Sequence, residues 1–251
     1  MQDSTTIQDV IKELDVIIDE SIITNSRLGL FAYIYRRTTF EIASEIALGH
    51  FEDNARLETL DVAFAKLYLD AYSAYKKGQT LSASWAYAFD QGEDSLTIVQ
   101  HIMLGMNAHI NLDLAVATAA TMSGGKIRDI ENDFNKVNDI LFQITNELQE
   151  RLSRVSPLMF ILDLIGKNND EKLINFSMRK ARKQSWNSAK LLWALKEKHG
   201  ENTRNKIDYF VLKLSEHIKS PKSIAIRLLL KIIQKFETKE VGAVISELKA
   251  D

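Results

Sequence analysis

The chain of 251 residues contains no cysteine, two prolines and ten glycines. The lack of cysteine excludes disulfide bonds, thiolate catalysis and cysteine-ligated zinc. Few prolines and glycines argue against a fold rich in tight turns, and no Asn-Gly or Asp-Gly hairpin signal or series of alternating strands is present. Any chemistry therefore depends on histidine, carboxylate, amide and hydroxyl groups carried by a helical scaffold.

Long apolar runs are also missing, because Asn, His, Asp or Lys interrupts each candidate well before the length of a membrane span. The opening residues, MQDSTTIQDV, carry an acid early and lack the basic and apolar regions of a signal peptide. A hydrophobic fraction of 45% and a charged fraction of 26% are typical of a soluble globular protein. We therefore expect a cytoplasmic protein.

Helical periodicity covers nearly the whole chain. It predicts an all-α fold of nine to ten helices in a single domain over residues 1–251, with a weak internal boundary near 166–170. The expected helices begin at Ile7 and then cover 26–48, 54–77, 82–89, 95–122, 126–154, 157–166, 170–199, 202–219 and a stretch after Pro221 that breaks near Thr238.

Polar residues interrupt the apolar stretch GMNAHINLDLAVATAATMSGG, residues 105–125. At 100° per residue, Asn107 and Asn111 share one side of a helix with Gln100, and His109 and Asp113 share the other. Polar groups on two sides of an apolar helix indicate that it has neighbours on several faces. We therefore predict that the 95–122 helix is central, and that the Gln100 row forms inter-helix hydrogen bonds.

The spacing of His109 and Asp113 lets both side chains face one metal ion, or lets the carboxylate orient the imidazole. A metal would need further ligands from another segment. We expect those ligands to be His50 and Asp53, which lie at a helix–helix junction. Asp61 falls on the inward face of its helix, as a further ligand or a general base.

His101 points away from His109 along the same helix, and we expect it to support the site from behind. Asp61 and His101 are thus the candidate catalytic residues, and the metal would be a divalent ion such as zinc. Two hypotheses remain open. One is a divalent-metal-dependent hydrolase of phosphoesters or other esters. The other is a non-catalytic ligand-binding or interaction domain in which the polar groups form a structural network, the commoner role of such a pair.

Three segments, HFEDNARLETLDVAFAKLYLDAY (50–72), WAYAF (85–89) and QHIMLGMNAHINLDLA (100–115), resemble a bacterial family of unknown function. The resemblance is best over residues 28–125. It implies a helical fold in which the three segments form one unit, and it implies no activity.

A weaker similarity is to all-helical zinc-dependent phospholipase C and single-strand nuclease enzymes, through the His109-x-x-x-Asp113 pair and the HFED segment. That family also has an N-terminal Trp and more His ligands, which this chain lacks. The similarity therefore implies a site of one or two metal ions, whose bound water would attack an ester.

The chain is acidic before residue 176 and basic after it. Residues 176–251 hold 17 Lys and Arg against 8 Asp and Glu, and residues 1–175 hold 15 against 26. We expect the two halves to attract each other or to present solvated helix faces. Within 178–198, Trp186 and Trp193 share one face, which favours core packing over a surface for membranes. Nucleic acid is not expected as a partner, whereas a small-molecule ligand or substrate is.

Overall fold

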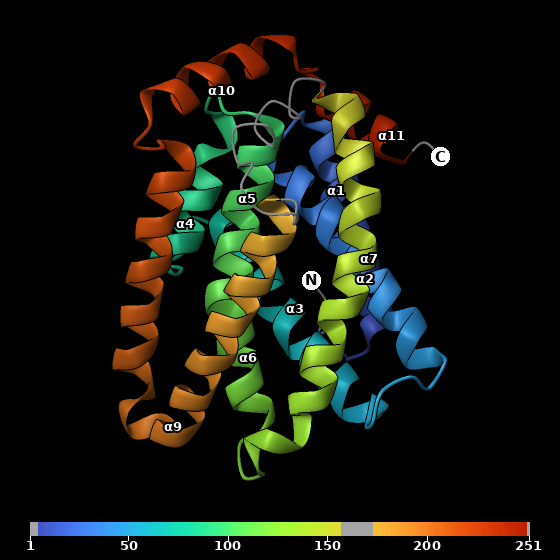
Figure 1. Ribbon diagram of the computed structural model, residues 1–251, viewed down its shortest axis with the longest axis vertical. Coiled ribbons are helices and arrows are strands. Elements are labelled where there is room, and N and C mark those ends of the chain that lie inside the picture. Colours follow the sequence, from blue (N-terminus) through green and yellow to red (C-terminus); the bar gives the residue numbers. More distant parts are fainter. Residues whose placement is uncertain (1–4, 157–172, 250–251) are drawn as a thin grey trace.

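The structure is a computed structural model that describes residues 5–156 and 173–249 (Figure 1). Within these ranges helices are the only regular secondary structure, which confirms the all-α prediction. The α-helices are α1 (Ile7–Ile23), α2 (Leu28–Ala47), α3 (Asn54–Lys76), α4 (Ala83–Asp90), α5 (Ile98–Ala108), α6 (Leu114–Thr121), α7 (Glu131–Val155), α9 (Leu173–Lys219), α10 (Ile224–Phe236) and α11 (Val241–Lys249).

The helix numbering runs to α11, against the nine to ten helices expected. The central stretch is divided into α5 and α6 by a π turn, His109–Asp113, and the C-terminal stretch is divided into α10 and α11. The expected helix at 157–166 and the expected boundary near 166–170 lie outside the described residues.

Local sequence signals explain where the central helix begins and where its neighbours end. Thr97 and Gln100 form a reciprocal capping box at the start of α5, which satisfies two backbone N–H groups that the first turn leaves free. Gly49 and Gly78 follow α2 and α3 with φ angles of 74° and 65°. This left-handed conformation ends a helix and is accessible to glycine without strain.

The segment formed by α5, the π turn and α6 lies at the centre of the bundle (Figure 1). It packs against α2, α3, α4 and α9, so its side chains have neighbours on several faces. This confirms the prediction that the 95–122 helix is central and buried. Buried apolar side chains from α1 to α11 form one continuous cluster around it.

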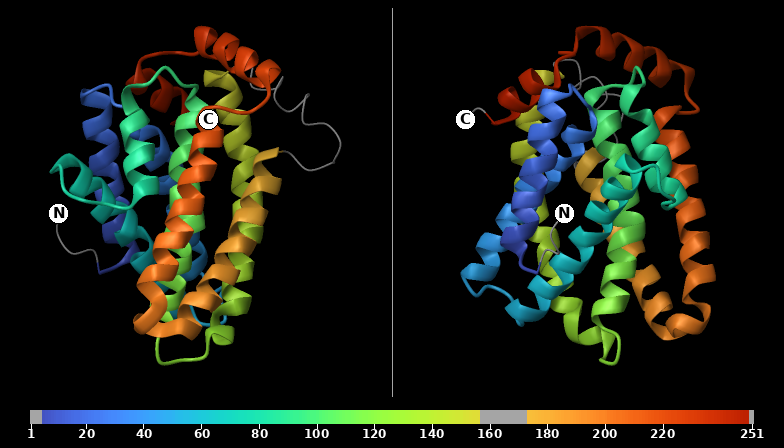
Figure 2. Two further views of the ribbon diagram at one scale, coloured as in Figure 1. Left: turned by 90° about the vertical axis from the view of Figure 1, so that its left-hand side faces the viewer. Right: turned by 180° about the vertical axis from the view of Figure 1, so that it is seen from behind.

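Helix α9 is a hairpin of two arms that lie beside the central segment (Figures 1 and 2). The chain reverses at Lys196, whose φ of 51° and ψ of −168° are not helical. The first arm buries Trp186, and the indole of Trp193 donates a hydrogen bond to the carbonyl of Met122. The tryptophans of the 178–198 stretch thus pack on the core, as expected.

The second arm of α9 meets the polar row of the central helix. The amide of Asn107 donates hydrogen bonds to the carbonyl of Val211 and the hydroxyl of Ser215, at 2.9 and 2.8 Å. The amide of Gln100 donates to the carbonyls of Ile218 and Lys219 near the end of the arm. Asn111 donates to Asn107 along the helix itself. These bonds confirm the prediction that this row links helices.

Substitution Gly105→Ala tests the close approach of α5 to α2. A Cβ atom at Gly105 would lie 2.4 Å from Cγ of Phe31, inside a packed group of rings. We expect the variant to lose about 1–3 kcal/mol of unfolding free energy, because overpacking forces neighbouring groups apart. Urea denaturation measures this loss.

The control for that variant is Gly200→Ala in α9, where an added Cβ meets no atom within 4 Å. This substitution should be neutral or stabilising by up to about 1 kcal/mol, because alanine favours the helix. Equal stability changes in the two variants would contradict the close packing of α5 on α2.

Candidate functional site

The π turn His109–Asp113 places two candidate residues inside the bundle. Leu114 donates its N–H to the carbonyl of His109, five residues earlier, where an α-helix would use the residue four earlier. His109 and Asp113 are both buried on the side that faces α2, α3 and α4. Turns of this type are rare and are often found at functional sites. The α-helical spacing used for the sequence prediction did not reveal this one.

Asp113 connects His109 to α4. Its Oδ2 atom lies 3.0 Å from Nδ1 of His109 and accepts a 2.8 Å hydrogen bond from the indole of Trp85. Because an indole N–H can only donate, Oδ2 acts as an acceptor, which favours the tautomer of His109 that carries its proton on Nδ1. The other ring nitrogen, Nε2, is then an acceptor and a potential base. It is buried and has no hydrogen-bond partner among the described residues.

Aromatic side chains surround the imidazole. The ring of Phe64 stacks on that of His109, with centroids 3.6 Å apart and an angle of 9° between the planes. Tyr35 meets the imidazole edge-on at 4.4 Å, and Phe31, Tyr68 and Trp85 complete the surroundings. We call Phe31, Tyr35, Phe64, Tyr68 and Trp85 the aromatic cluster. It holds the His109 ring in one orientation.

Burial in this cluster controls the protonation of the pair. It lowers the pKa of His109 and raises the pKa of Asp113, because each charged form loses its hydration, and the contact between the two groups opposes both shifts. The lowered pKa keeps the imidazole of His109 neutral near pH 7. Its Nε2 atom is therefore available to accept a proton or a hydrogen bond.

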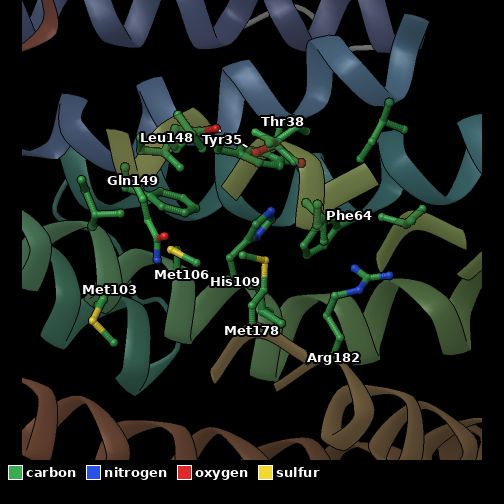
Figure 3. Close-up of a pocket in the computed structure, with 18 of the residues that line it drawn as sticks. Tyr35, Thr38, Phe64, Met103, Met106, His109, Leu148, Gln149, Met178 and Arg182 are labelled. Carbon is green, nitrogen blue, oxygen red and sulfur yellow. Dashed lines mark hydrogen bonds between the residues drawn. The ribbon is translucent and has the colours of Figure 1, made fainter. Parts of the chain in front are cut away.

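His109 lines a pocket enclosed by α2, α3, α5, the π turn, α7 and the first arm of α9 (Figure 3). The pocket holds about 940 Å³ of empty space, open solvent included, of which about 100 Å³ admits the centre of a water molecule. One bound water needs only about 10–15 Å³ of space for its centre, so the pocket is several-fold larger than the site of a single water. We call it the central pocket.

Apolar groups supply most of the wall of the central pocket. Among the described residues, the polar lining consists of Thr38, Asp61, His109, Gln149 and Arg182, with the hydroxyl of Tyr35. The remaining side chains are Phe31, Ile34, Ile42, Phe64, Val99, Ile102, Met103, Met106, Ile110, Val137, Leu141, Ile144, Leu148, Leu152 and Met178.

Asp61 and Arg182 lie in one wall of the pocket, and also line a smaller cavity beside it. Burial raises the pKa of Asp61 to about 7 and lowers that of Arg182 to about 10, and each charge partly offsets the shift of the other. Arg182 donates hydrogen bonds to the side chain of Asn138 and the carbonyl of Phe134. Asp61 keeps a buried carboxylate oxygen with no hydrogen-bond partner among the described residues. The wall therefore combines a held cation with a carboxyl group that titrates near neutral pH.

The predicted metal ligands His50 and Asp53 do not join this pocket. Nδ1 of His50 lies 2.8 Å from a carboxylate oxygen of Glu45, and the imidazole is half exposed. Asp53 caps the start of α3 by accepting the backbone N–H of Arg56 at 3.0 Å. The sequence placed both residues correctly at a helix junction, but the junction lies at the surface.

Within the residues that the structure describes, no three His, Asp or Glu side chains are grouped as a metal site. Among the described residues, His50, Asp53, His109 and Asp113 are thus not grouped together, and their assignment as metal ligands stays a prediction. The physical reason is that Asp53 serves its own helix as a cap, and Nδ1 of His109 is already occupied by Asp113.

His101 is buried but does not line the central pocket. It lies near Arg27 and Asp94, and its pKa falls to about 4, mainly through burial and then through the charge of Arg27. The expected supporting role of His101 stays a prediction. Asp61, in contrast, lines the central pocket together with His109. It is thus the candidate catalytic residue that lies in the same pocket as a candidate metal ligand.

Sequence reasoning missed Gln149 and the role of Arg182. Arg182 was visible only as one of several basic residues leading to Trp186, and nothing in that run marks it as buried. Gln149 lies on the inward stripe of the 126–154 helix, where a polar residue among Ile144, Leu148 and Leu152 is a usable signal. Both amide atoms of Gln149 are buried without a partner among the described residues.

The fold and the site thus define an all-helical protein with an internal, largely apolar pocket next to a buried His–Asp pair. The chain matches the model of a family described as a family of unknown function (DUF5995) over residues 7–221. This match covers most of the chain, so the protein belongs to that family, and the resemblance expected from its segments is confirmed. Comparisons with curated proteins and with solved structures return no match, and the similarity to zinc-dependent phospholipases is not shown.

Substitution Trp85→Phe tests the hydrogen bond that links α4 to the π turn. It removes the indole donor and leaves the buried Oδ2 of Asp113 with His109 alone. We expect a loss of about 1–3 kcal/mol in unfolding free energy. Trp193→Phe is the control, because it also removes an indole hydrogen bond, but from a half-buried site. A loss in Trp85→Phe no larger than in the control would contradict the proposed importance of Asp113.

Substitution Asp61→Asn tests the raised pKa of this group. The folded protein keeps the carboxyl proton up to about pH 7, whereas the unfolded chain releases it near 3.8. Protonation of Asp61 therefore stabilises the fold fully below pH 3.8, and this contribution is lost as the pH rises through 7. Relative to wild type, Asp61→Asn should gain up to about 4 kcal/mol of stability between pH 4 and 8.

Thermal or urea denaturation across this pH range measures the change. Asp70→Asn makes the same substitution at an exposed position of the same helix and is the control. A stability difference between Asp61→Asn and wild type that does not change with pH would contradict the raised pKa of Asp61.

Proposed function

We propose that this protein binds an elongated, mainly apolar small molecule in the central pocket, and that His109 recognises a hydrogen-bonding group of that ligand. The observation that carries the proposal is the Nε2 atom of His109. It is buried, lacks a partner among the described residues, and is oriented by Asp113 at the wall of a largely apolar cavity. Buried polar groups are normally hydrogen-bonded, so such an atom is suited to a ligand.

The shape of the pocket supports an elongated ligand. Arg182 is bonded to Asn138, and Gln149 lies eleven residues further along α7, which corresponds to about 16 Å at 1.5 Å per residue. Figure 3 shows Gln149 and Arg182 on opposite sides of His109. The wall between them includes Leu141, Ile144 and Leu148. A ligand with an apolar middle and polar ends matches this order of groups.

Three methionines increase the range of shapes that the pocket can accept. Met103, Met106 and Met178 all line it (Figure 3). The methionine side chain is unbranched and polarizable, so it adapts to irregular apolar surfaces. This composition favours binding of an apolar molecule over a polar metabolite such as a sugar or nucleotide.

Catalysis on the bound ligand is the second candidate function. A histidine whose Nδ1 is held by a carboxylate and whose Nε2 is free has the arrangement of a general base and its orienting group. This arrangement supports the hydrolase hypothesis in a metal-independent form, in which His109 is the base and Asp113 is the positioning residue. The metal-dependent form has less support, because the other expected ligands lie at the surface.

Displacement of a neutral apolar fluorophore, N-phenyl-1-naphthylamine, tests the binding function. The wild-type protein should bind the dye with a Kd in the micromolar range, as expected for a small apolar ligand. Met106→Trp fills part of the pocket and should weaken binding about tenfold or more.

The control is Phe142→Trp, which introduces the same side chain at an exposed position of α7 outside the pocket. Circular dichroism and the melting temperature establish that both variants are folded. No dye binding by the wild type, or equal binding by the folded Met106→Trp variant, would contradict the proposal.

A further inference from the structure

Helix α10 presents a stripe of large apolar side chains to solvent. Ile224, Leu228, Ile232 and Phe236 recur every fourth residue, and they are 66%, 57%, 48% and 66% exposed. Ile233, on the side of the helix opposite Ile224, is only 1% exposed. We call these four exposed residues the α10 stripe. Scattered single apolar residues on a surface are ordinary, whereas a continuous exposed stripe marks an interaction surface.

Cations lie directly beside the stripe. Arg227, Lys231 and Lys235 are exposed and recur every fourth residue along the same helix. On a projection at 100° per residue, Lys231 and Lys235 fall about 20° to either side of Ile224. The long side chains of lysine can therefore extend past the apolar groups and place their charges at the edge of the same face.

Acidic residues are missing from this face. The sequence from Lys222 to Phe236 contains no Asp or Glu. The next residue, Glu237, is buried, accepts the backbone N–H of Ile98 and receives the hydroxyl of Ser156. The charge of Glu237 is thus used to attach the end of α10 to the bundle. What α10 presents to solvent is apolar and positively charged.

The position of α10 makes the whole stripe accessible at once. The helix lies across one end of the bundle, at a large angle to the long helices below it (Figures 1 and 2). Ile233 is buried on the other side, whereas the four residues of the stripe are about half exposed or more, so the stripe faces solvent. A flat surface could therefore contact α10 along its full length.

We propose that α10 docks the protein on the surface of an anionic lipid membrane, with the stripe inserted among the acyl chains and Arg227, Lys231 and Lys235 at the headgroups. An amphipathic helix with bulky aliphatic and aromatic groups on one side and cations beside them has the composition of an interfacial helix. None of the described helices is long and apolar enough to cross a bilayer. The contact is therefore a peripheral one.

Charge distinguishes this partner from a second copy of the chain. Two α10 helices face to face would bring their cations together, and like charges across an interface are unfavourable. Four apolar side chains per copy also give a small contact compared with a stable dimer interface of about 1,200–2,000 Å². An anionic membrane avoids both the repulsion and the small contact area. Its headgroups neutralise the cations, and the membrane surface is larger than the stripe. The inference goes beyond the proposed function and does not depend on it.

Vesicle co-sedimentation of the full chain tests the inference. The probes are vesicles of phosphatidylcholine alone and vesicles that contain equal parts of phosphatidylcholine and phosphatidylglycerol. The wild type should partition onto the anionic vesicles at low salt and dissociate as the salt concentration rises. Two double variants should each bind the anionic vesicles at least about tenfold more weakly than the wild type. They are Leu228→Ser/Ile232→Ser and Lys231→Glu/Lys235→Glu.

The matched control is Phe40→Ser/Leu48→Ser. It also removes two exposed apolar side chains, one from the C-terminal part of α2 and one from the residue that follows this helix, and this region lies away from α10 (Figure 1). This variant should bind anionic vesicles as the wild type does. All four α10 positions are exposed, and the melting temperature establishes that each variant is folded.

Three outcomes would overturn the inference. The wild type could fail to bind anionic vesicles, or the folded α10 variants could bind as well as the wild type. Alternatively, light scattering could show that the wild type is a dimer that the Leu228→Ser/Ile232→Ser variant dissociates, which would assign the stripe to a second copy. Dye binding in the central pocket should be unchanged in the α10 variants, so a failure of this inference differs from a failure of the proposed function.

Discussion

The hydrogen bonds of Asp113 are the interaction on which the centre of this protein depends. One carboxylate oxygen joins the imidazole of His109 on the central helix to the indole of Trp85 on α4. Both partners also belong to one group of rings in contact with one another, together with Phe31, Tyr35 and Phe64. Polar satisfaction and aromatic packing therefore support the same arrangement. A change to any one of these groups alters the surroundings of all the others.

The sequence was informative about the helices and about one polar row of the central helix. Its 3.6-residue periodicity predicted the elements, and the hydrogen bonds of Asn107 to α9 followed from the need of a buried amide for partners. Such properties depend on local spacing and on general rules of burial. They can be worked out without knowing which helices are neighbours.

The site was harder to predict because it depends on contacts between distant segments. Arg182 approaches Asp61 only after the first arm of α9 has packed beside α3 and α7, and a basic run in the sequence does not reveal which of its members becomes buried. Asp53 illustrates a second difficulty. Its place beside a helix start was correct, but a cap and a metal ligand need the same residue type, and only the fold distinguishes them.

The central pocket places unusual demands on stability. Asp61 and Arg182 are buried in one wall without a hydrogen bond between them, and the amide of Gln149 and the Nε2 of His109 add further unsatisfied groups. Each such group opposes folding, because it has lost water without gaining a full set of partners. Proteins keep groups of this kind mainly where binding or catalysis requires them. The polar lining is thus itself an argument that the pocket has a use.

The π turn also constrains how this family can vary in length. A π turn contains one residue more than the α-helix would need over the same path, so it behaves as a tolerated single-residue insertion. Removing one residue between His109 and Asp113 would restore a regular helix over the same path and shorten the spacing of the pair from four residues to three. The length of this segment and the geometry of the His–Asp pair are therefore set by the same residues.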